Sequence, residues 1–379
     1  MPPLTVLQLL PEMQVGGVEQ GTIEIAAALV RAGHRALVVS AGGRMVPTLE
    51  ATGAQHVALP IGRKRLSTLL LTHQLREICE REQVDIVHAR SRLPAWIGHL
   101  ALRGIPAARR PRWITTVHGP YTVNRYSRIM VSGERVIAIS EFIRHYIRHG
   151  YPDLDPGRIT VIPRGVDRAQ YPRDYAPPAA WLEQWRQAHP ELARRHALVL
   201  PGRLTRWKGQ EDFIRLIGRL VARGLPVHGL IAGGAHPRKR KFERELQRLV
   251  IKLELEPAVS FLGSRSDLRE ILATSACAFS LTGEPEAFGR TTIEALSLGV
   301  PVIGYDHGGT GEILRSIFPA GVVPVGDIEA AADRLAAFLQ QRPLLPVIHP
   351  YTVARLQNAT LAVYRELAAA PRASLLQRA

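Results

Sequence analysis

The stretch EPEAFGRTTIEAL, residues 284–296, places three carboxylates where a loop runs into an apolar helix. Glu286 and Glu294 are eight positions apart, a rise of about 12 Å in a continuous helix. That separation is too long for two carboxylates that serve one scissile glycosidic bond at the retaining-hydrolase distance. A metal site is also disfavoured, because no His or Asp joins them at ligand spacing. If Glu286 lies in a loop and Glu294 on a helix that begins near Gly289, the two could hold different hydroxyl groups of one extended ligand.

A second group of candidates combines cations with glycines. In PGRLTRWKGQ, Arg203 follows an apolar run and Lys208 precedes a helix start. Two cations at a helix N-terminus favour a diphosphate, because charge-assisted hydrogen bonds add to the field of the helix. The segment lacks the Walker spacing, and a plain surface turn is the alternative. Gly233, in IAGG, repeats the theme of a strand followed by glycine, so the pattern predicts a long anionic ligand.

The N-terminal half offers a glycine loop and a histidine. Gly16 and Gly17, in MQVGGVEQG, would let the backbone approach a ligand just before a helix, although a tight turn without a ligand is the alternative. The spacing is not the dinucleotide fingerprint G-x-G-x-x-G. His118 follows the apolar run WITTV and could polarise a hydroxyl or move a proton, although a lone histidine is often structural. His88 ends a similar run and is the weaker candidate.

Short apolar runs alternate with helical patterns from the N-terminus, and the alternation starts afresh at residue 196. This arrangement is typical of parallel βαβ units. We therefore expect two doubly wound, Rossmann-like α/β domains that face one another across a cleft. The predicted boundaries are a first Rossmann-like domain over 1–170, a Pro-rich, charged linker over 171–195, a second Rossmann-like domain over 196–350, and a C-terminal helix within 351–379 that could cross back to the first domain.

The net charge of +16 points to an anionic partner: a phosphorylated ligand, nucleic acid or an anionic membrane surface. No nucleic-acid-binding signature accompanies the charge, so we expect no nucleic acid partner. The basic clusters are GRKR (62–65), RRPR (109–112) and RKRKFER (238–244). The first two could form a membrane-facing patch, with a solvated surface as the alternative. The chain shows neither a basic leader nor an apolar run long enough to cross a bilayer, which predicts a cytoplasmic location.

Taken together, these motifs resemble the retaining GT-B glycosyltransferases of family 4, which use nucleotide sugars and include many bacterial lipopolysaccharide and capsule transferases. The resemblance spans nearly the whole chain, through GGVEQG, VHGPY, AISEFIRHYI, VIPRGVD, GRLTRWKGQ, IAGG, VSFLG and EAFGRTTIEALSLGVPVIGYDHGGTGE. The last segment is the most specific. One departure is Arg164, which stands where the family often has Asn.

The resemblance implies that the domain over 1–170 binds the acceptor and that the domain over 196–350 binds the nucleotide sugar. It also implies a role for each matching residue. Glu286 would contact hydroxyls of the donor sugar, the backbone amides of Ala287, Phe288 and Gly289 would bind sugar or phosphate, and Glu294 would bind the ribose. Arg203 and Lys208 would bind the diphosphate, and His118 would lie near the donor sugar. Gly16 and Gly17 would lie close to the phosphates and the reacting centre. Ser264 and Arg265 would lie near the base.

The implied reaction is metal-independent transfer of a sugar with its anomeric configuration kept, without a bound cofactor. The nucleotide-sugar donor and a lipid-linked or lipopolysaccharide-type glycan acceptor are the expected substrates, at the cytoplasmic face of the membrane, where peripheral contact with anionic lipid would fit the basic clusters. A GT-B nucleotide-sugar epimerase and a non-catalytic nucleotide-sugar-binding protein are the competing hypotheses.

Overall fold

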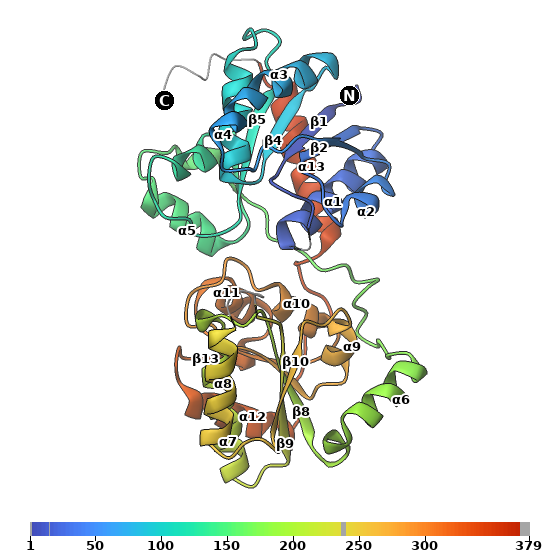
Figure 1. Ribbon diagram of the computed structural model, residues 1–379, viewed down its shortest axis with the longest axis vertical. Coiled ribbons are helices and arrows are strands. Elements are labelled where there is room, and N and C mark those ends of the chain that lie inside the picture. Colours follow the sequence, from blue (N-terminus) through green and yellow to red (C-terminus); the bar gives the residue numbers. More distant parts are fainter. Residues whose placement is uncertain (1, 15, 236–239, 372–379) are drawn as a thin grey trace. The chain divides into compact units, whose positions relative to one another are not determined.

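The structure is a computed structural model that describes residues 2–14, 16–235 and 240–371 (Figure 1). The chain forms two compact units. One unit is Gly165–Thr352, and the other holds the rest of the described chain. Each unit contains its own parallel sheet. The expected pair of Rossmann-like domains is confirmed.

The N-terminal unit contains a seven-stranded sheet in the order β3-β2-β1-β4-β5-β6-β7. Every pairing is parallel, so the strands all end at the same edge. The order reverses between β1 and β4, and ligands of open α/β sheets bind beside such a point. The strands are β1 (Thr5–Leu9), β2 (Arg35–Ser40), β3 (Gln55–Ala58), β4 (Ile86–Ala89), β5 (Arg112–Val117), β6 (Arg135–Ala138) and β7 (Ile159–Val161).

The helices of this unit are α1 (Gly17–Arg31), α2 (Val46–Glu50), α3 (Leu71–Arg81), α4 (Arg92–Arg103), α5 (Glu141–Gly150) and α13 (Val353–Ala369). The C-terminal helix α13, red in Figure 1, packs against the N-terminal helix α1. Its residues Leu361, Val363, Tyr364 and Leu367 are buried in the same apolar cluster as Ile25. The burial of this apolar stripe explains why the last helix belongs to the first unit.

The second unit contains a six-stranded parallel sheet in the order β10-β9-β8-β11-β12-β13, which reverses between β8 and β11. Its strands are β8 (His196–Pro201), β9 (Val227–Ala232), β10 (Val259–Gly263), β11 (Cys277–Ser280), β12 (Val302–Tyr305) and β13 (Val322–Val323). Its helices are α6 (Ala179–Ala188), α7 (Gln210–Ala222), α8 (Lys241–Lys252), α9 (Leu268–Ala273), α10 (Arg290–Ser297), α11 (Gly308–Ile317) and α12 (Ile328–Gln340).

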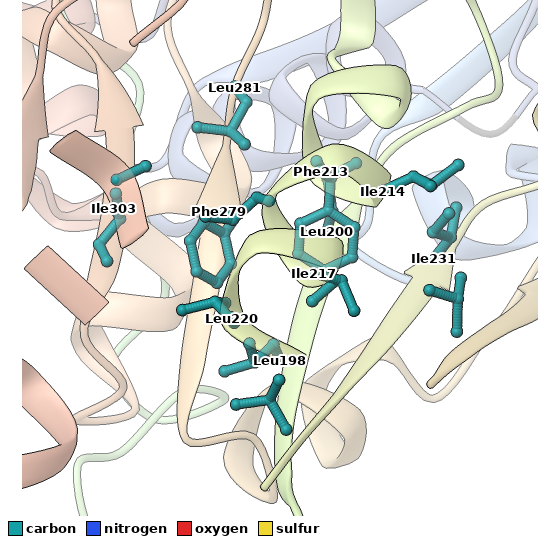
Figure 2. Packing of buried hydrophobic residues seen from close by; sticks show 14 of the residues in the cluster. Leu198, Leu200, Phe213, Ile214, Ile217, Leu220, Ile231, Phe279, Leu281 and Ile303 are labelled. Carbon is teal, nitrogen blue, oxygen red and sulfur yellow. The ribbon is translucent and has the colours of Figure 1, made fainter. Parts of the chain in front are cut away.

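The core of the second unit is built where α7 covers the sheet. Figure 2 shows the apolar face of α7, with Phe213, Ile214, Ile217 and Leu220, against side chains of the central strands. The rings of Phe213 and Phe279 lie 5.3 Å apart between centroids. Because the central strands are apolar on both faces, helices must cover both faces, and the carboxyl edge with its loops is left for polar residues.

The segment 171–195, expected to be a linker, lies inside the second unit and contains α6. The indole of Trp185 is buried, and Trp181 donates from Nε1 to Asp267 over 2.7 Å. Tyr175 donates to Glu270 over 2.6 Å. These aromatic side chains anchor the segment to the domain in spite of its prolines and charges. The division between the units falls after Arg164.

Within the described residues, no helix is both long and apolar enough to cross a lipid bilayer.

Candidate functional site

The loops after β8 and β11 lie side by side, because these strands flank the point where the strand order of the second sheet reverses. The amide of Gly283, after β11, donates to the carbonyl of Trp207, after β8, over 2.8 Å. This bond ties together the two loops that carry Lys208 and Glu286. The two motifs are 78 positions apart in the sequence and meet through the topology of the sheet.

Lys208 and Glu286 form an ion pair through Nζ and Oε1. Their side chains are only 19% and 10% exposed, so solvent screens the pair less than a surface pair. Nζ also lies 4.4 Å from the centroid of the Trp207 ring, a cation–π contact. The other carboxylate oxygen of Glu286 accepts from the Thr310 hydroxyl over 3.3 Å. The carboxylate is therefore fixed from both sides.

The loop of Glu286 is held in place by the first turn of α11. The amide of Gly309 donates to the carbonyl of Glu286 over 2.7 Å. Gly289, which precedes α10, has a φ of 96°, and a Cβ there would lie 2.8 Å from the Thr310 hydroxyl oxygen. Since a positive φ and a close neighbour both exclude side chains, this position needs glycine. Sequence reasoning missed Thr310, although its place after the paired glycines of DHGGTGE was the available signal.

Ala287, Phe288 and Gly289 connect Glu286 to α10, which begins at Arg290 as expected. The ring of Phe288 is buried and packs edge-on against Tyr351, with centroids 5.9 Å apart. Its side chain therefore belongs to the core, and any contact with a ligand would have to come from the backbone. The N-terminus of α10 carries a partial positive charge that favours anionic or polar ligand atoms.

Glu294 lies on α10 itself and is nearly buried. Its Oε1 accepts from Nε of Arg290, one turn earlier, over 2.8 Å. Glu286 and Glu294 therefore pair with different cations, and they lie on different elements, Glu286 in the loop and Glu294 in the helix. This arrangement fits two separate contacts with one ligand.

Three other predicted residues of this unit differ in what surrounds them. Arg203, after β8, is exposed, and its guanidinium forms no ion pair within the described part of the chain. A Cβ on Gly233 would lie 1.8 Å from the carbonyl oxygen of Gly202, so the packing of two backbones already explains this glycine. The guanidinium of Arg265 donates to both oxygens of Asp267, over 2.8 and 2.6 Å. The structure therefore joins Lys208 and Glu286 directly, while Arg265 is occupied by its own neighbour.

In the N-terminal unit, the glycine loop after β1 and His118 after β5 are linked by Arg164. The Arg164 guanidinium donates to the carbonyl of Gly17 over 2.6 Å and to Nδ1 of His118 over 3.0 Å. A Cβ on Gly17 would meet no atom within 4 Å, so the loop borders open space there. A Cβ on Gly21 would lie 2.6 Å from Arg164. The long, buried Arg164 side chain thus makes both contacts from one position.

These contacts determine the protonation of His118. A guanidinium can only donate, so Nδ1 of His118 must accept and the proton of the neutral ring resides on Nε2. Burial and the positive charges of Arg164 and Arg90 hold the pKa of His118 well below its usual range. Nε2 is buried and has no hydrogen-bond partner among the described residues. The arrangement supplies a neutral N–H donor rather than a histidine that cycles through a cation near pH 7.

His88 has a structural role. Its Nδ1 bonds the hydroxyl of Tyr364 and its Nε2 that of Thr116, each over 2.6 Å. Both ring nitrogens are therefore occupied, and the first of these bonds anchors the C-terminal helix.

The sequence Asp-Leu-Asp at 153–155 has the letters of a metal-binding motif, but it forms a turn in which Asp155 accepts from the amide of Gly157. In the described ranges, no three His, Cys, Asp or Glu side chains gather closely enough to hold a metal ion.

Comparisons with known proteins agree with this architecture. Residues 15–170 match the family described as Glycosyltransferase Family 4, and residues 183–352 match Glycosyl transferases group 1. The chain is 26% identical over 288 residues to an N-acetyl-alpha-D-glucosaminyl L-malate synthase of Bacillus anthracis, covering 73% of this chain and 71% of that protein. It is 27% identical over 201 residues to the lipopolysaccharide core biosynthesis mannosyltransferase LpsB of Rhizobium meliloti, covering 52% and 55%.

Solved structures show the same fold. A glycosyltransferase from Rickettsia africae superposes with a TM-score of 0.84 at 26% identity over 100% of both chains. Anabaena Alr3699/HepE, solved in complex with UDP and glucose, superposes with a TM-score of 0.75 at 22% identity over 96% and 95%.

The two parallel-sheet units and these matches define a glycosyltransferase of the GT-B class. Within that class the chain belongs to the family 4 glycosyltransferases, which confirms the family inferred from the motifs.

Proposed function

We propose that this glycosyltransferase transfers a sugar from a nucleoside-diphosphate sugar to a lipid-linked or lipopolysaccharide-type glycan, with retention of the anomeric configuration. The observation that carries the proposal is the ion pair of Lys208 and Glu286 where the loops after β8 and β11 meet. The pair supports the proposal because Lys208 would offer a cation to a diphosphate and Glu286 a carboxylate to sugar hydroxyls, at the edge of the sheet where nucleotide ligands bind.

The donor would lie across the second unit. Its sugar hydroxyls would donate to the fixed carboxylate of Glu286, and the amides of residues 287–289 would donate to sugar or phosphate oxygens. The diphosphate would be bound by Lys208 and by the exposed Arg203, and the ribose by Glu294. Among the remaining candidates, Gly233 would act through backbone alone, and Arg265 would have to give up Asp267 to reach the base.

In the transfer step, the bond from the anomeric carbon to the diphosphate oxygen breaks and its electron pair leaves with the diphosphate. The acceptor hydroxyl forms the new bond on the face from which the diphosphate departs, and the hydroxyl proton passes to a diphosphate oxygen. Fixed cations that stabilise charge on the leaving group lower the barrier, typically by several kcal/mol. We assign this role to Arg203 and Lys208, without a metal ion or bound cofactor.

His118 and the glycine loop of the first unit would contribute to the same step. The Nε2–H of His118 is a buried donor without a partner among the described residues. An unsatisfied buried donor costs about 1–3 kcal/mol of stability, which a ligand that accepts the hydrogen bond would recover. A hydroxyl of the donor sugar is the acceptor we propose. Gly16 and Gly17 would lie near the phosphates, where the open space beside Gly17 leaves room for a ligand.

The lipopolysaccharide mannosyltransferase among the relatives supports the acceptor class, and we place the reaction at the cytoplasmic face of the membrane. A thermal-shift screen against UDP, GDP and ADP and their sugars would identify the donor. Proton NMR of the product formed with that donor would then give the configuration of the new bond. A product with inverted configuration would overturn the retaining mechanism.

A further inference from the structure

The segment that joins β3 to α3 presents leucines to solvent in an unusual concentration. Leu66, Leu69 and Leu70, in the 3-10 turn η1 (Leu66–Leu70), are 89%, 51% and 76% exposed. Thr68, in the same turn, is 5% exposed. The turn therefore directs a small polar side chain inward and three large apolar side chains outward, the reverse of ordinary burial.

Local hydrogen bonds hold this orientation. The Thr68 hydroxyl donates to the carbonyl of Arg63 over 2.6 Å, and the Thr68 amide donates to the carbonyl of Arg65 over 3.0 Å. At the start of the segment, Gly62 packs so closely on Pro11 that a Cβ would lie 2.5 Å from the proline Cβ. The outward leucines are thus part of a defined turn seated on the loop that follows β1.

Three cations precede the leucines. Arg63, Lys64 and Arg65 are exposed, and none of them forms an ion pair within the described ranges. No acidic residue occurs between Glu50 and Glu77. Apolar side chains beside unpaired cations are the combination that binds an anionic bilayer, because the leucines enter the boundary of the head groups and the cations meet the lipid phosphates.

The RRPR cluster differs from this segment, because two of its arginines are engaged within the fold. In RRPR, Arg110 donates to the carbonyls of Leu102 and Ile105, and Arg112 pairs with Glu134. These two arginines therefore hold the fold together, unlike the unpaired cations at 63–65. In the third cluster, Arg238 and Lys239 lie outside the described residues.

The position of the segment links it to the proposed acceptor side. It follows the carboxyl end of β3, and the glycine loop and His118 follow the carboxyl ends of β1 and β5 in the same parallel sheet. All three therefore lie at one edge of the N-terminal unit. A surface that binds lipid there would bring a lipid-linked glycan to the edge that carries the acceptor-domain candidates.

We propose that residues 62–71 form a membrane-docking surface for anionic phospholipid, with Leu66, Leu69 and Leu70 inserted and Arg63, Lys64 and Arg65 on the head groups. The docking itself stands on this segment, and its use in catalysis rests on the proposed function. A second exposed apolar stretch, with Leu344, Val347 and Ile348 at 97%, 63% and 79% exposure, provides a matched control in the other unit. Its nearby cations are engaged, since Arg168 and Arg173 donate to carbonyls of residues 345–347.

The test is co-sedimentation of the full chain with vesicles of phosphatidylglycerol and phosphatidylethanolamine, compared with phosphatidylcholine vesicles. We expect binding to the anionic vesicles only. The triple variant Leu66→Ser, Leu69→Ser, Leu70→Ser and the triple variant Arg63→Gln, Lys64→Gln, Arg65→Gln should each bind at least about ten-fold more weakly. The variant Leu344→Ser, Val347→Ser, Ile348→Ser should bind within about two-fold of the parent.

Absence of binding by the parent, or loss of binding in the control variant alone, would overturn the docking surface. Sedimentation velocity tests another occupant: a dimer that dissociates in the leucine variant would make this turn an interface between two copies. Nucleotide-sugar hydrolysis in the absence of vesicles separates the two proposals. Vesicle binding without any donor turnover would support the docking surface and refute the proposed function. Donor turnover without vesicle binding would support the proposed function and refute the docking surface.

Discussion

The guanidinium of Arg164 donates to Nδ1 of His118 over 3.0 Å. Because arginine cannot accept a hydrogen bond, this contact fixes the ring as the tautomer with its proton on Nε2. Burial and the charge of the same cation both oppose protonation of the ring and lower its pKa. Arg164 is the residue at which the chain departs from the common family motif, and the structure gives this departure a physical role in positioning His118.

Arg164→Met should release this control. The pKa of His118 should rise toward the usual 6.5, and both neutral tautomers should become populated, because Nδ1 loses its donor and the ring loses a neighbouring charge. We expect kcat to fall by about 10- to 100-fold with a smaller change in KM. Two-bond proton–nitrogen NMR of the imidazoles reports the tautomer directly. His88 is the internal control, and a His118 spectrum identical to the parent would contradict the positioning role.

The ion pair of Lys208 and Glu286 should be visible as coupling between two substitutions. Lys208→Met leaves the carboxylate of Glu286 mostly buried without its cation, which should lower the free energy of unfolding by about 2–4 kcal/mol. Glu286→Gln should show a smaller loss. The double variant should lose less than the sum of the two, as measured by urea unfolding. Strict additivity would show that the pair contributes nothing to the free protein.

Acidification should destabilise the protein between about pH 6.5 and pH 5. Burial holds the pKa values of His88 and His118 well below 6.5 in the folded chain. The unfolded chain therefore binds protons that the folded chain does not, and the lost stability approaches about 1.4 kcal/mol per pH unit for each such histidine. The stabilising effect is fully present above the unfolded pKa and declines as pH falls below it. A melting temperature that is constant from pH 7 to pH 5 would contradict these buried neutral rings.

The glycines at the start of α11 should control donor binding through the Glu286 loop. Gly309→Ala would place a Cβ 2.2 Å from the carbonyl oxygen of Phe288, so the loop must shift and donor affinity should fall by about ten-fold or more. Gly283→Ala is the matched control, since a Cβ there meets no atom within 4 Å. Isothermal titration with the donor nucleotide measures both. Equal effects of the two substitutions would mean that the packing of Gly309 does not position the site.

The strand–helix alternation predicted two Rossmann-like units, and it did so because parallel strands buried on both faces are apolar throughout. The start of α10 after Gly289 was also predictable from the glycine and the apolar pattern that follows. The place of the segment 171–195 in the second unit was not predictable in this way, because it depends on the tertiary contacts of Trp181 and Trp185. Composition alone does not reveal which surface an aromatic side chain will cover.

The residues of the candidate site were predictable from the sequence, but the contacts between their side chains were not. Nothing in the local sequence indicates that Lys208 pairs with Glu286, since the contact arises from the reversal of strand order between β8 and β11. The contact between Arg164 and His118 likewise joins the ends of different strands. Arg265 shows the converse: its neighbour Asp267 was visible two positions away, and the pair they form was overlooked.

The most direct test of the central claim measures nucleoside diphosphate released from a panel of UDP, GDP and ADP sugars by the parent chain and by Glu286→Gln and Lys208→Met. We expect release from one donor by the parent, and a loss of about 100-fold or more in both variants while each remains folded by circular dichroism. Release at the parental rate by either variant, or no release or binding of any donor by the parent, would contradict it.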